Sequence, residues 1–343
     1  MMGLPPKGSS DTFAPCTRSN SAWDMNHKAT VIGLGGMGQQ MLARMAKRPG
    51  FEITNAWDPD PAAMQTTGER YPGIRLSDSI AQAISDPDTS VVYIASPPIA
   101  HRAIAIVALD VGKAVYCEKP LGVDVNDSRA LVEHAQASGC VNIVNFSLAS
   151  TAATREAEAW LAEGRPGEVV GIDIRIRFSQ WPRTWQMGAV DWLGKRAEGG
   201  FTREVISHWV YLTERFFGRA ALEDSWVGYP EGDGAETRLH ATLRIGTLPV
   251  SVVGSIGGVG KDQVEYTIWG SVASCRITDW HRFSVSDGGD WELGHTDITN
   301  LGPKDHARQL SNAAAAVAGE SHSMPDFADA LSVQVLVEGM LSD

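Results

Sequence analysis

A glycine-rich turn lies between a short apolar run and a stretch of helical spacing near the start of the chain. Residues 30–38 are Thr-Val-Ile-Gly-Leu-Gly-Gly-Met-Gly. In a strand–turn–helix unit, Gly33 permits the tight turn, Gly35 lets a phosphate approach the backbone, and Gly38 allows close packing of helix on strand. The positive end of that helix favours phosphate, so this GxGxxG pattern predicts a dinucleotide-binding domain. The candidate cofactor contacts in the loop are Gly33, Gly35, Gly36, Met37 and Gly38.

Short apolar runs alternate with helical patterns up to residue 146. The runs that predict strands are 29–34, 51–57, 91–95, 114–117 and 141–146. The stretches that predict helices between them include 36–47, 99–111 and 124–138. Because each crossover helix must cover a face of the sheet, the alternation predicts a doubly wound parallel α/β sheet of the Rossmann type. We place this domain at residues 29–148.

The pattern changes beyond this point. A helix is expected over 151–163, and the strand after it, 168–178, alternates apolar and polar residues, which predicts one buried face. A long helix starts at Gly200, strands follow from about 226 to 280, and two helices close the chain. The apolar face expected for the last helix consists of Phe327, Ala330, Leu331 and Val335. We expect residues 149–343 to form an α+β domain with one large, mainly antiparallel sheet, which binds substrate and makes oligomer contacts.

Composition narrows the class of protein. The chain has 343 residues, 43% of them hydrophobic, which is enough for two domains with their own cores. Residues 1–28 lack the apolar segment of a secretory signal, and we interpret them as a disordered tail or an artefactual extension, with Met25 a candidate initiator. A net charge of −12 argues against nucleic acid or an anionic membrane as a partner. Four scattered cysteines and no apolar run near the ~20 residues of a membrane span predict reduced thiols in the cytoplasm.

Asp58 ends the second predicted strand, 20 residues after Gly38. A carboxylate at this place accepts hydrogen bonds from both ribose hydroxyls of a dinucleotide. Its neighbours Trp57 and Pro59 include no cation for a 2′-phosphate, which favours NAD over NADP. The alternative is a turn residue in the Asp-Pro-Asp-Pro run 58–61.

Two further segments carry a family resemblance. Ile-Ala-Ser-Pro at 94–97 and the run 112–121, which contains Cys-Glu-Lys-Pro-Leu, resemble the Gfo/Idh/MocA family of glucose–fructose oxidoreductase and inositol dehydrogenase over residues 29–342. The resemblance implies a nicotinamide-dependent oxidoreductase that forms a homodimer or homotetramer through the outer face of its sheet. It also implies that Glu118 orients the site and that Pro120 follows a cis bond. Candidate cofactor contacts in these segments are Ser96, Pro97, His101, Glu118 and Lys119.

Lys119 follows the strand 114–117, and doubly wound sheets bind ligands at the carboxyl ends of their strands. A lysine there can hydrogen-bond a substrate oxygen and assist its gain or loss of a proton. The alternative is a surface lysine in a turn.

A second motif, Gly-Gly-Phe-Thr-Arg-Glu-Val-Ile-Ser-His at 199–208, is similar to the family's glycine pair followed by Asp-x-x-x-His. Glu204 then takes the Asp position and His208 the His position, and four-residue spacing places both on one helix face. Histidine suits proton transfer near neutral pH, and an acidic neighbour orients it. A simple surface pair is the alternative. The motif departs from the family at Glu204, at Ile206, usually Gly, and at Arg203.

Cations and aromatic residues near this motif suggest substrate contacts. Arg203, Arg183 or both could bind a substrate carboxylate through a bidentate fork, or be solvent-facing charges. Trp185, with Trp181 and Trp192, could stack on a sugar ring or on nicotinamide, or pack in a core or interface. We expect no metal site, because the spacing of the candidate ligands Glu204, His208 and His240 does not support one.

The sequence therefore predicts an NAD(H)-dependent enzyme that transfers hydride between nicotinamide and a hydroxyl or carbonyl carbon of a small polar substrate, most simply a sugar or cyclitol. Lys119, His208 and Glu204 are the catalytic candidates, and Lys119, Arg183, Trp185, Arg203, Glu204 and His208 the substrate-binding ones. Three alternatives stay open: reduction of an imine or keto acid that carries a carboxylate, redox-neutral glycoside cleavage, and a non-catalytic NAD-binding regulator.

Overall fold

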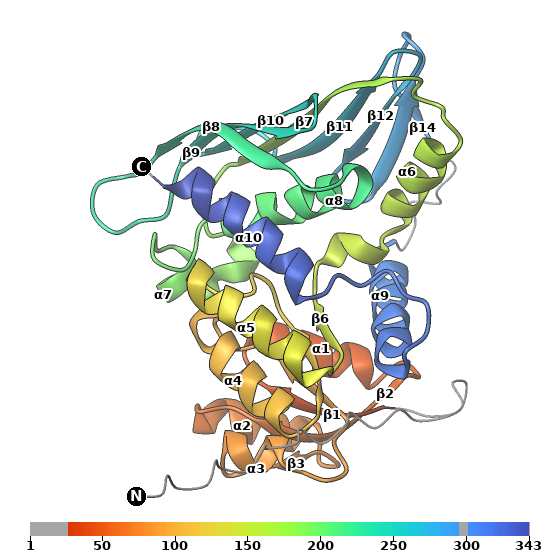
Figure 1. Ribbon diagram of the computed structural model, residues 1–343. Helices are drawn as coiled ribbons and strands as arrows, with labels where there is room; N and C mark the ends of the chain where they lie inside the picture. Colours follow the sequence, from red (N-terminus) through yellow and green to blue (C-terminus); the bar gives the residue numbers. More distant parts are fainter. Residues whose placement is uncertain (1–26, 295–300, 343) are drawn as a thin grey trace, which may run out of the picture.

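The computed structural model describes residues 27–294 and 301–342 as two layered domains (Figure 1). The segment interpreted as a tail or extension lies outside the described residues up to position 26. His27 and Lys28, which we assigned to that segment, belong to the first strand, where their backbones pair with the second strand. No helix in these described ranges is long and apolar enough to cross a membrane.

The N-terminal domain contains a parallel sheet in the order β3-β2-β1-β4-β5-β6, which confirms the expected Rossmann fold. Its strands are β1 (His27–Ile32), β2 (Phe51–Trp57), β3 (Arg75–Leu76), β4 (Val91–Ile94), β5 (Ala114–Cys117) and β6 (Asn142–Val144). Its helices are α1 (Gly36–Met45), α2 (Pro61–Arg70), α3 (Ile80–Ile84), α4 (Pro98–Asp110) and α5 (Val125–Ser138). Every residue of β4 and β5 is buried, because helices cover both faces of the sheet.

The C-terminal domain contains a second sheet, of eight strands among the described residues, in the order β14-β13-β12-β11-β7-β10-β9-β8. Its strands are β7 (Val169–Phe178), β8 (Ala221–Gly228), β9 (Arg238–Ile245), β10 (Leu248–Ile256), β11 (Gln263–Gly270), β12 (Ser274–Thr278), β13 (Arg282–Ser286) and β14 (Glu292–Leu293). Only the pairing of β7 with β10 is parallel, so the mainly antiparallel sheet is confirmed. The expected alternation in β7 holds, with Ile172, Ile174 and Ile176 buried.

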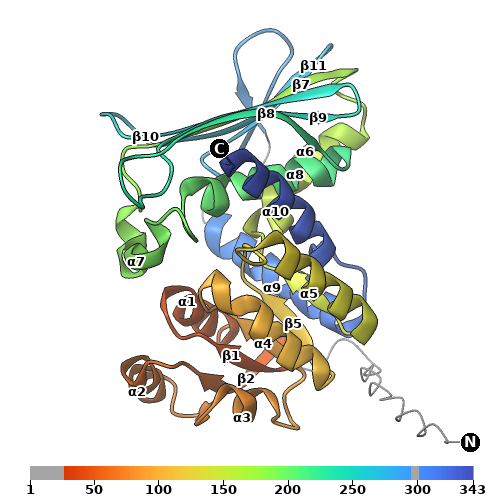
Figure 2. The same ribbon diagram turned by 60° about the vertical axis from the view of Figure 1, so that its left-hand side comes forward.

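Helices cover one face of this larger sheet, the face toward the Rossmann domain (Figure 2). They are α6 (Ala152–Ala162), α8 (Ser207–Phe217) and α10 (Phe327–Leu341). The helix expected from Gly200 begins as a π-helical turn, Thr202–Ile206, and continues as α8. A short helix, α7 (Val190–Leu193), stands apart beside the gap between the domains (Figure 2).

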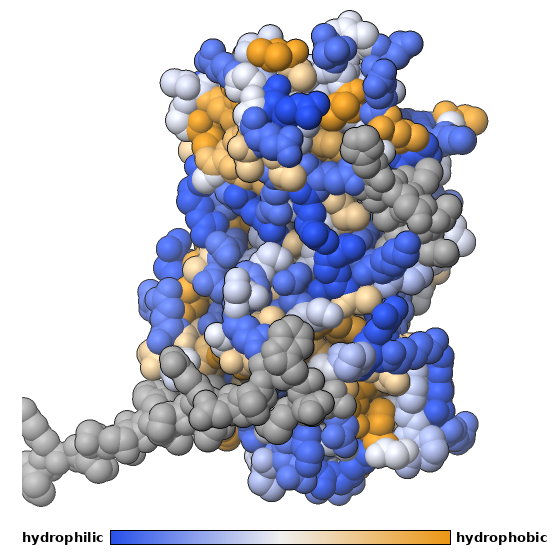
Figure 3. All heavy atoms as spheres, turned by 90° about the vertical axis from the view of Figure 1, so that its right-hand side faces the viewer, coloured by the Kyte–Doolittle hydropathy of each residue, from blue (hydrophilic) through white to orange (hydrophobic). Residues whose placement is uncertain are grey.

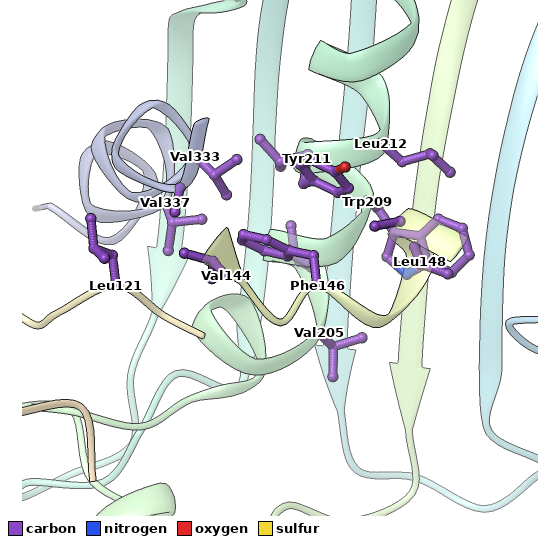
Figure 4. Close-up of a cluster of buried hydrophobic side chains, with 14 of the residues drawn as sticks. Leu121, Val144, Phe146, Leu148, Val205, Trp209, Tyr211, Leu212, Val333 and Val337 are labelled. Atoms are coloured by element: carbon purple, nitrogen blue, oxygen red, sulfur yellow. The ribbon is translucent and has the colours of Figure 1, made fainter. Parts of the chain in front are cut away.

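The two domains share apolar packing where they meet (Figure 4). Val144 and Phe146 come from the end of the Rossmann domain, Trp209 and Tyr211 from α8, and Val337 from α10. Phe146 stacks on Tyr211 with ring centroids 4.7 Å apart. This common core holds the carboxyl edge of the parallel sheet against the start of α8, where the motif residues lie.

The last two helices differ from the sequence expectation. Helix α9 (Leu301–Ala318) follows the second sheet in the chain, but its Leu310 and Ala313 join the core of the Rossmann domain beside α1. In α10 the expected buried face is wrong at Val335, which is 42% exposed. This helix packs on α5, α8 and β8 together, so its buried residues spread around most of its circumference.

The face that carries α6, α9 and the β12–β14 edge of the larger sheet is mostly hydrophilic (Figure 3). Its hydrophobic side chains form separate patches, some of them near the sheet. Among the exposed apolar residues of this sheet are Val272, after β11, and Leu293 in β14.

Candidate active site

A cavity of about 890 Å³ opens at the carboxyl ends of the parallel strands, between the two domains. Doubly wound sheets bind ligands at this edge, and the volume lies in the range of small-molecule and cofactor sites. The lining residues proposed from the sequence are Gly33, Gly35, Gly36, Met37, Asp58, Ser96, Pro97, Glu118, Lys119, Arg183, Trp185, Glu204 and His208. Gly38, His101 and Arg203 are not among the lining residues.

The glycine loop leaves open space in front of α1. Gly33 has φ +95°, and a Cβ there would lie 2.6 Å from the carbonyl carbon of Ala95. A Cβ on Gly38 would lie 1.9 Å from the oxygen of Gly33, so Gly38 serves the packing of helix on strand. Within residues 27–294 and 301–342, no atom lies within 4 Å of a Cβ built on Gly35 or Gly36, and no side chain caps the helix. This cradle therefore fits a phosphate of a dinucleotide.

Asp58 follows β2 and lines the cavity between Trp57 and Pro59. One carboxylate oxygen accepts from the backbone N–H of Leu34 at 2.6 Å, and the other accepts from that of Asp60 at 2.8 Å. The residue therefore shapes the turn and also lines the cavity, and its contact with a ribose stays a prediction.

Ser96 and Pro97 line the cavity after β4, and the hydroxyl oxygen of Ser96 is buried without a hydrogen-bond partner among the described residues. The expectation that His101 contacts a cofactor is wrong. His101 is buried under this loop, with its ring nitrogens 2.9 Å from the backbone oxygens of Ser96 and Pro120. It joins the two loops that carry Ser96 and Lys119, and burial lowers the pKa of its imidazole.

Lys119 and Glu204 bring the two motifs together. The Nζ atom of Lys119 lies 2.7 Å from Oε2 of Glu204 and also donates to the backbone oxygen of Glu204 at 3.1 Å. Both side chains are mostly buried, and the Lys119–Pro120 peptide bond is cis, as the resemblance implied. The ion pair thus joins the carboxyl end of β5 to the helix of the second domain.

The π-helical turn that carries Glu204 starts from a glycine pair. Gly200 has φ +103°, and a Cβ on it would lie 2.1 Å from the carboxylate of Glu236. That carboxylate accepts from the backbone N–H of Thr202 at 2.7 Å. Glycine is thus required because Glu236 holds the first turn in place. A widened helical turn is frequent at functional sites.

His208 lies one turn after Glu204 and is buried at the cavity wall. Its ring meets Phe146 and Trp280 edge-on, at centroid distances of 5.5 and 5.6 Å. In the part of the chain that the structure describes, its Nδ1 has no hydrogen-bond partner. Burial lowers the pKa of His208 well below its ordinary value, and the charges of Lys119 and Arg183 lower it further. The imidazole is therefore neutral and able to accept a proton.

Glu118 is buried beside Lys119 in a hydrogen-bond network. Its Oε1 accepts from the hydroxyl of Tyr93 and from Nδ2 of Asn145, the latter at 2.8 Å. The amide oxygen of Asn145 accepts in turn from Nε2 of Gln309, at 3.1 Å. Burial raises the pKa of Glu118, partly offset by these donors and by Lys119. The network holds the loop after β5 in position.

Arg203 does not take the expected place. Its guanidinium forms a bidentate pair with Glu338 of α10, at 2.6 and 2.7 Å, and donates to the backbone oxygens of Arg196 and Gly199 at 2.8 Å. The expectation that Arg203 binds a substrate carboxylate is therefore wrong. Its side chain does not line the cavity and instead ties α10 to the glycine pair.

Arg183 lines the cavity just before Trp185. Trp185 is exposed at the cavity mouth, and Trp192 also lines the cavity. Trp181 instead packs against Phe178 and donates from Nε1 to the backbone oxygen of Leu193 at 3.1 Å. His240, considered with Glu204 and His208 as a metal ligand, lies on β9 against Trp226 and does not line the cavity. Within the described residues no group of three or more His, Cys, Asp or Glu side chains could hold a metal ion.

Several lining residues were missed in the sequence. Asn145 follows β6 at the carboxyl edge, so the reasoning applied to Lys119 could have found it. Trp280 is placed by a tight turn in which it and Asp279 have φ of +71° and +50°. Arg44 and His306 line the cavity where α1 meets α9, with Nη2 and Nε2 2.7 Å apart. Nothing in the pattern predicted that α9 would return to the first domain.

Comparisons with known proteins agree with this geometry. Residues 27–146 match the Gfo/Idh/MocA oxidoreductase family, described as an NAD-binding Rossmann fold. A levoglucosan dehydrogenase of Pseudarthrobacter phenanthrenivorans is 31% identical over 151 residues, 42% of this chain and 38% of that protein. A 1,5-anhydro-D-fructose reductase of Ensifer adhaerens is 36% identical over 151 residues, 42% of this chain and 43% of that protein. The chain thus matches less than half the length of these relatives.

Solved structures extend the likeness in fold to nearly the whole chain. A levoglucosan dehydrogenase with NADH and levoglucosan superposes with a TM-score of 0.81 at 20% identity, covering 92% of this chain and 96% of that one. A 3-ketoreductase from Actinomadura kijaniata with NADP and TDP-benzene gives a TM-score of 0.77 at 18% identity, covering 92% and 97%. The chain has the two-domain fold of these structures, and its Rossmann domain, residues 27–146, matches the Gfo/Idh/MocA oxidoreductase family.

Proposed function

We propose that this protein is an NAD(H)-dependent oxidoreductase that interconverts a hydroxyl and a carbonyl group on a sugar or cyclitol. The observation that carries the proposal is the meeting of Lys119, Glu204 and His208 at one wall of a cavity whose other end is the open glycine cradle. The names of the relatives, a levoglucosan dehydrogenase, a 1,5-anhydro-D-fructose reductase and inositol 2-dehydrogenases, support a substrate of this class.

The residues of the first domain fit a dinucleotide. Its phosphates would lie on Gly35 and Gly36 at the start of α1, Asp58 would accept from the ribose, and the unpartnered hydroxyl of Ser96 would bond the same ligand. When bound, the nicotinamide supplies hydride transfer to or from the substrate carbon. The carboxylate of Asp58 would repel a 2′-phosphate, which supports NAD rather than NADP.

The chain's own residues supply orientation and proton transfer. Lys119, held at Nζ by Glu204, would donate a hydrogen bond to the reacting oxygen of the substrate and stabilise negative charge there. In the oxidative direction, the neutral imidazole of His208 would accept the hydroxyl proton, and in the reductive direction it would return it. Glu118 and Asn145 would hold the Lys119 loop in position.

We also propose a homodimer or homotetramer that forms through the outer face of the larger sheet. Trp226 of β8, Val253 of β10 and Trp269 of β11 are exposed on strands whose opposite face is covered by helices. Exposed apolar side chains on a sheet face mark an association surface. Light scattering of the purified protein tests this: wild type would be dimeric or larger, and Trp226→Arg would shift it toward monomer.

The enzymatic proposal is tested by the absorbance of reduced nicotinamide. The purified protein is mixed with NAD or NADP and a panel of sugars, cyclitols, hydroxy acids and cyclic imines, each in the appropriate redox state. Turnover that is lost in Lys119→Ala and His208→Ala, and kept in the exposed control Lys47→Ala, supports the proposal. Dinucleotide binding without turnover on any substrate would contradict it in favour of a regulator or a redox-neutral glycosidase. Failure to bind either dinucleotide would overturn it.

A further inference from the structure

Arg183 lines the cavity, and its guanidinium has no acidic partner among the described residues. Its Nε donates to Oε1 of Gln186 at 2.9 Å, whereas its two Nη atoms donate to no described residue. It forms no ion pair with any carboxylate of the part of the chain that the structure describes. Glu204 and Asp262 act on it only through longer-range electrostatic attraction.

The guanidinium is held in a fixed place. Its central carbon lies 4.9 Å from the ring centroid of Trp185, 5.0 Å from that of Phe178 and 5.8 Å from that of Trp181. Gln186 is buried, and its side-chain oxygen also accepts from the backbone N–H of Arg183 at 3.3 Å. Aromatic faces and one hydrogen bond therefore orient the side chain and leave its Nη edge unused.

Arg203, which has a structural role, shows which acceptors this chain provides for the N–H groups of a guanidinium. Arg203 has a bidentate carboxylate, Glu338, and two backbone oxygens. Arg183 is partly buried as well, and burial lowers its pKa, but it has none of these acceptors. Partial burial of a cation without an anionic partner is costly, and an anionic ligand would offset that cost.

The other charged groups around His208 are already paired. Lys119 is neutralised by Glu204, and Glu118 is held in its own hydrogen-bond network. The imidazole of His208 is neutral. Arg183 acts electrostatically on both Glu204 and His208, so it lies near them, yet it forms no ion pair with a described carboxylate. Arg44, a second cation of the cavity lining, instead bonds Gln40 and His306.

We propose that the substrate is an acidic sugar or polyol whose carboxylate is bound by the Nη edge of Arg183 while its reacting hydroxyl lies at Lys119 and His208. A planar guanidinium matches the two oxygens of a carboxylate. This inference rests on the proposed function and names its substrate class.

The test compares matched acids, amides and neutral sugars. Initial rates with NAD are measured on D-glucuronate, D-glucuronamide and D-glucose, and on the corresponding galactose series, with D-glucose 6-phosphate as the phosphate probe. Calorimetric titration of the same compounds into the NADH-loaded protein gives affinity independently of turnover. The variants are Arg183→Gln and Arg183→Lys, with Arg129→Gln on the exposed surface of α5 as control. Thermal melting and NADH affinity show whether each variant folds.

In wild type we expect kcat/KM and affinity for an acid to exceed those for its amide by about ten- to a hundredfold, the range for a charge-assisted hydrogen bond. Arg183→Gln should bring this ratio close to one, Arg183→Lys should leave an intermediate ratio because a point charge replaces the fork, and Arg129→Gln should keep the full ratio.

The outcomes separate this inference from the proposed function. Neutral sugars that react as well as their acids, with a ratio that Arg183→Gln leaves unchanged, would overturn the carboxylate assignment while the oxidoreductase proposal stands. A clear preference for the sugar phosphate would also overturn it. If NADH binds but no compound binds or reacts, both proposals are overturned.

Discussion

Lys119 and Glu204 are 85 residues apart in sequence and belong to different domains, yet Nζ of the lysine lies 2.7 Å from Oε2 of the glutamate. The contact is possible because the shared core around Phe146 and Trp209 holds the carboxyl end of β5 against the start of α8. Glu204 also accepts from the same Nζ through its backbone oxygen, at 3.1 Å. The pair therefore sets the position of the amine that faces the cavity.

Removing the carboxylate of this pair should impair catalysis more than substrate affinity. We expect Glu204→Gln to lower kcat by about tenfold to a hundredfold, because Lys119 loses the partner that orients it. Glu204→Asp keeps the charge but shortens the reach, so it should fall between Glu204→Gln and wild type. Steady-state kinetics of both variants, with the exposed Glu163→Gln as control, gives the answer. A variant that changed only KM would show that Glu204 binds substrate rather than positions Lys119.

Substitutions at two glycines of the loop should have different effects, one on folding and the other on cofactor binding. Gly38→Ala places a methyl group 1.9 Å from the oxygen of Gly33, and we expect overpacking to cost about 1–3 kcal/mol in the free energy of unfolding. Gly35→Ala meets nothing within 4 Å, so the variant should fold as wild type does but bind NADH more weakly. Thermal melting and a fluorescence titration of NADH measure the two effects. Wild-type affinity in Gly35→Ala would show that phosphate does not bind at this place.

Much of the fold could be predicted, because local patterns of apolar residues and turns indicate where strands and helices lie. The strands 51–57 and 114–117 both have the expected bounds. For 114–117 the reason is that a continuous apolar run between turns is typical of a strand buried on both faces. The two-residue strand β3 was missed, because Arg75 and Leu76 carry no periodicity. The buried face of α10 was misassigned at Val335, because a helix packed on several elements has no single apolar stripe.

The candidate site also contains residues that the sequence could place and residues that it could not. Gly33, Lys119 and His208 belong to motifs, and motifs at strand ends and on a helix face can be placed from sequence alone. His101 and Arg203 could not be assigned, because their roles depend on partners far along the chain, Pro120 and Glu338. A charged or polar residue next to a motif has the same sequence appearance whether it faces the cavity or the core.

Asp58 should control the choice between the two dinucleotides. Asp58→Asn keeps an oxygen that can accept from Leu34 but removes the charge that repels a 2′-phosphate. We expect the ratio of kcat/KM for NAD over NADP to fall by about tenfold, equivalent to about 1.4 kcal/mol. Asp60→Asn, in the same turn, caps α2 equally well and should leave the ratio unchanged. An unchanged ratio in Asp58→Asn would place the ribose elsewhere.

Arg203 should matter for stability and not for substrate choice. Arg203→Met breaks the pair with Glu338 and leaves that carboxylate partly buried without a partner, at a cost of about 3–5 kcal/mol. Chemical denaturation should show this loss, whereas Arg244→Met, at an exposed pair on the larger sheet, should have little effect. Replacing both Arg203 and Glu338 by Met should recover part of the stability. A change in the acid-to-amide preference of Arg203→Met, without a loss of stability, would contradict the structural role.

His208 should make both stability and activity depend on pH in a defined direction. Its pKa in the folded protein lies well below its ordinary value of 6.5, so below pH 6.5 the unfolded chain takes up a proton that the folded imidazole does not. The free energy of unfolding should therefore fall as the pH drops from 6.5 toward the folded pKa. His101 and His306 act in the same direction, the latter with a pKa of about 4, so the contribution of His208 is the difference between wild type and His208→Gln.

The lowered pKa of His208 should also affect the pH dependence of catalysis. Because the imidazole stays neutral through mildly acidic pH, kcat/KM for oxidation should show no decline near pH 6.5, where an ordinary histidine base would become protonated. Arg183→Gln removes a positive charge that lowers this pKa, so it should move the acidic limb of the profile upward. The exposed variant Arg129→Gln should leave it in place. A wild-type profile that falls around pH 6.5 would show that His208 is exposed to water in the working enzyme or is not the base.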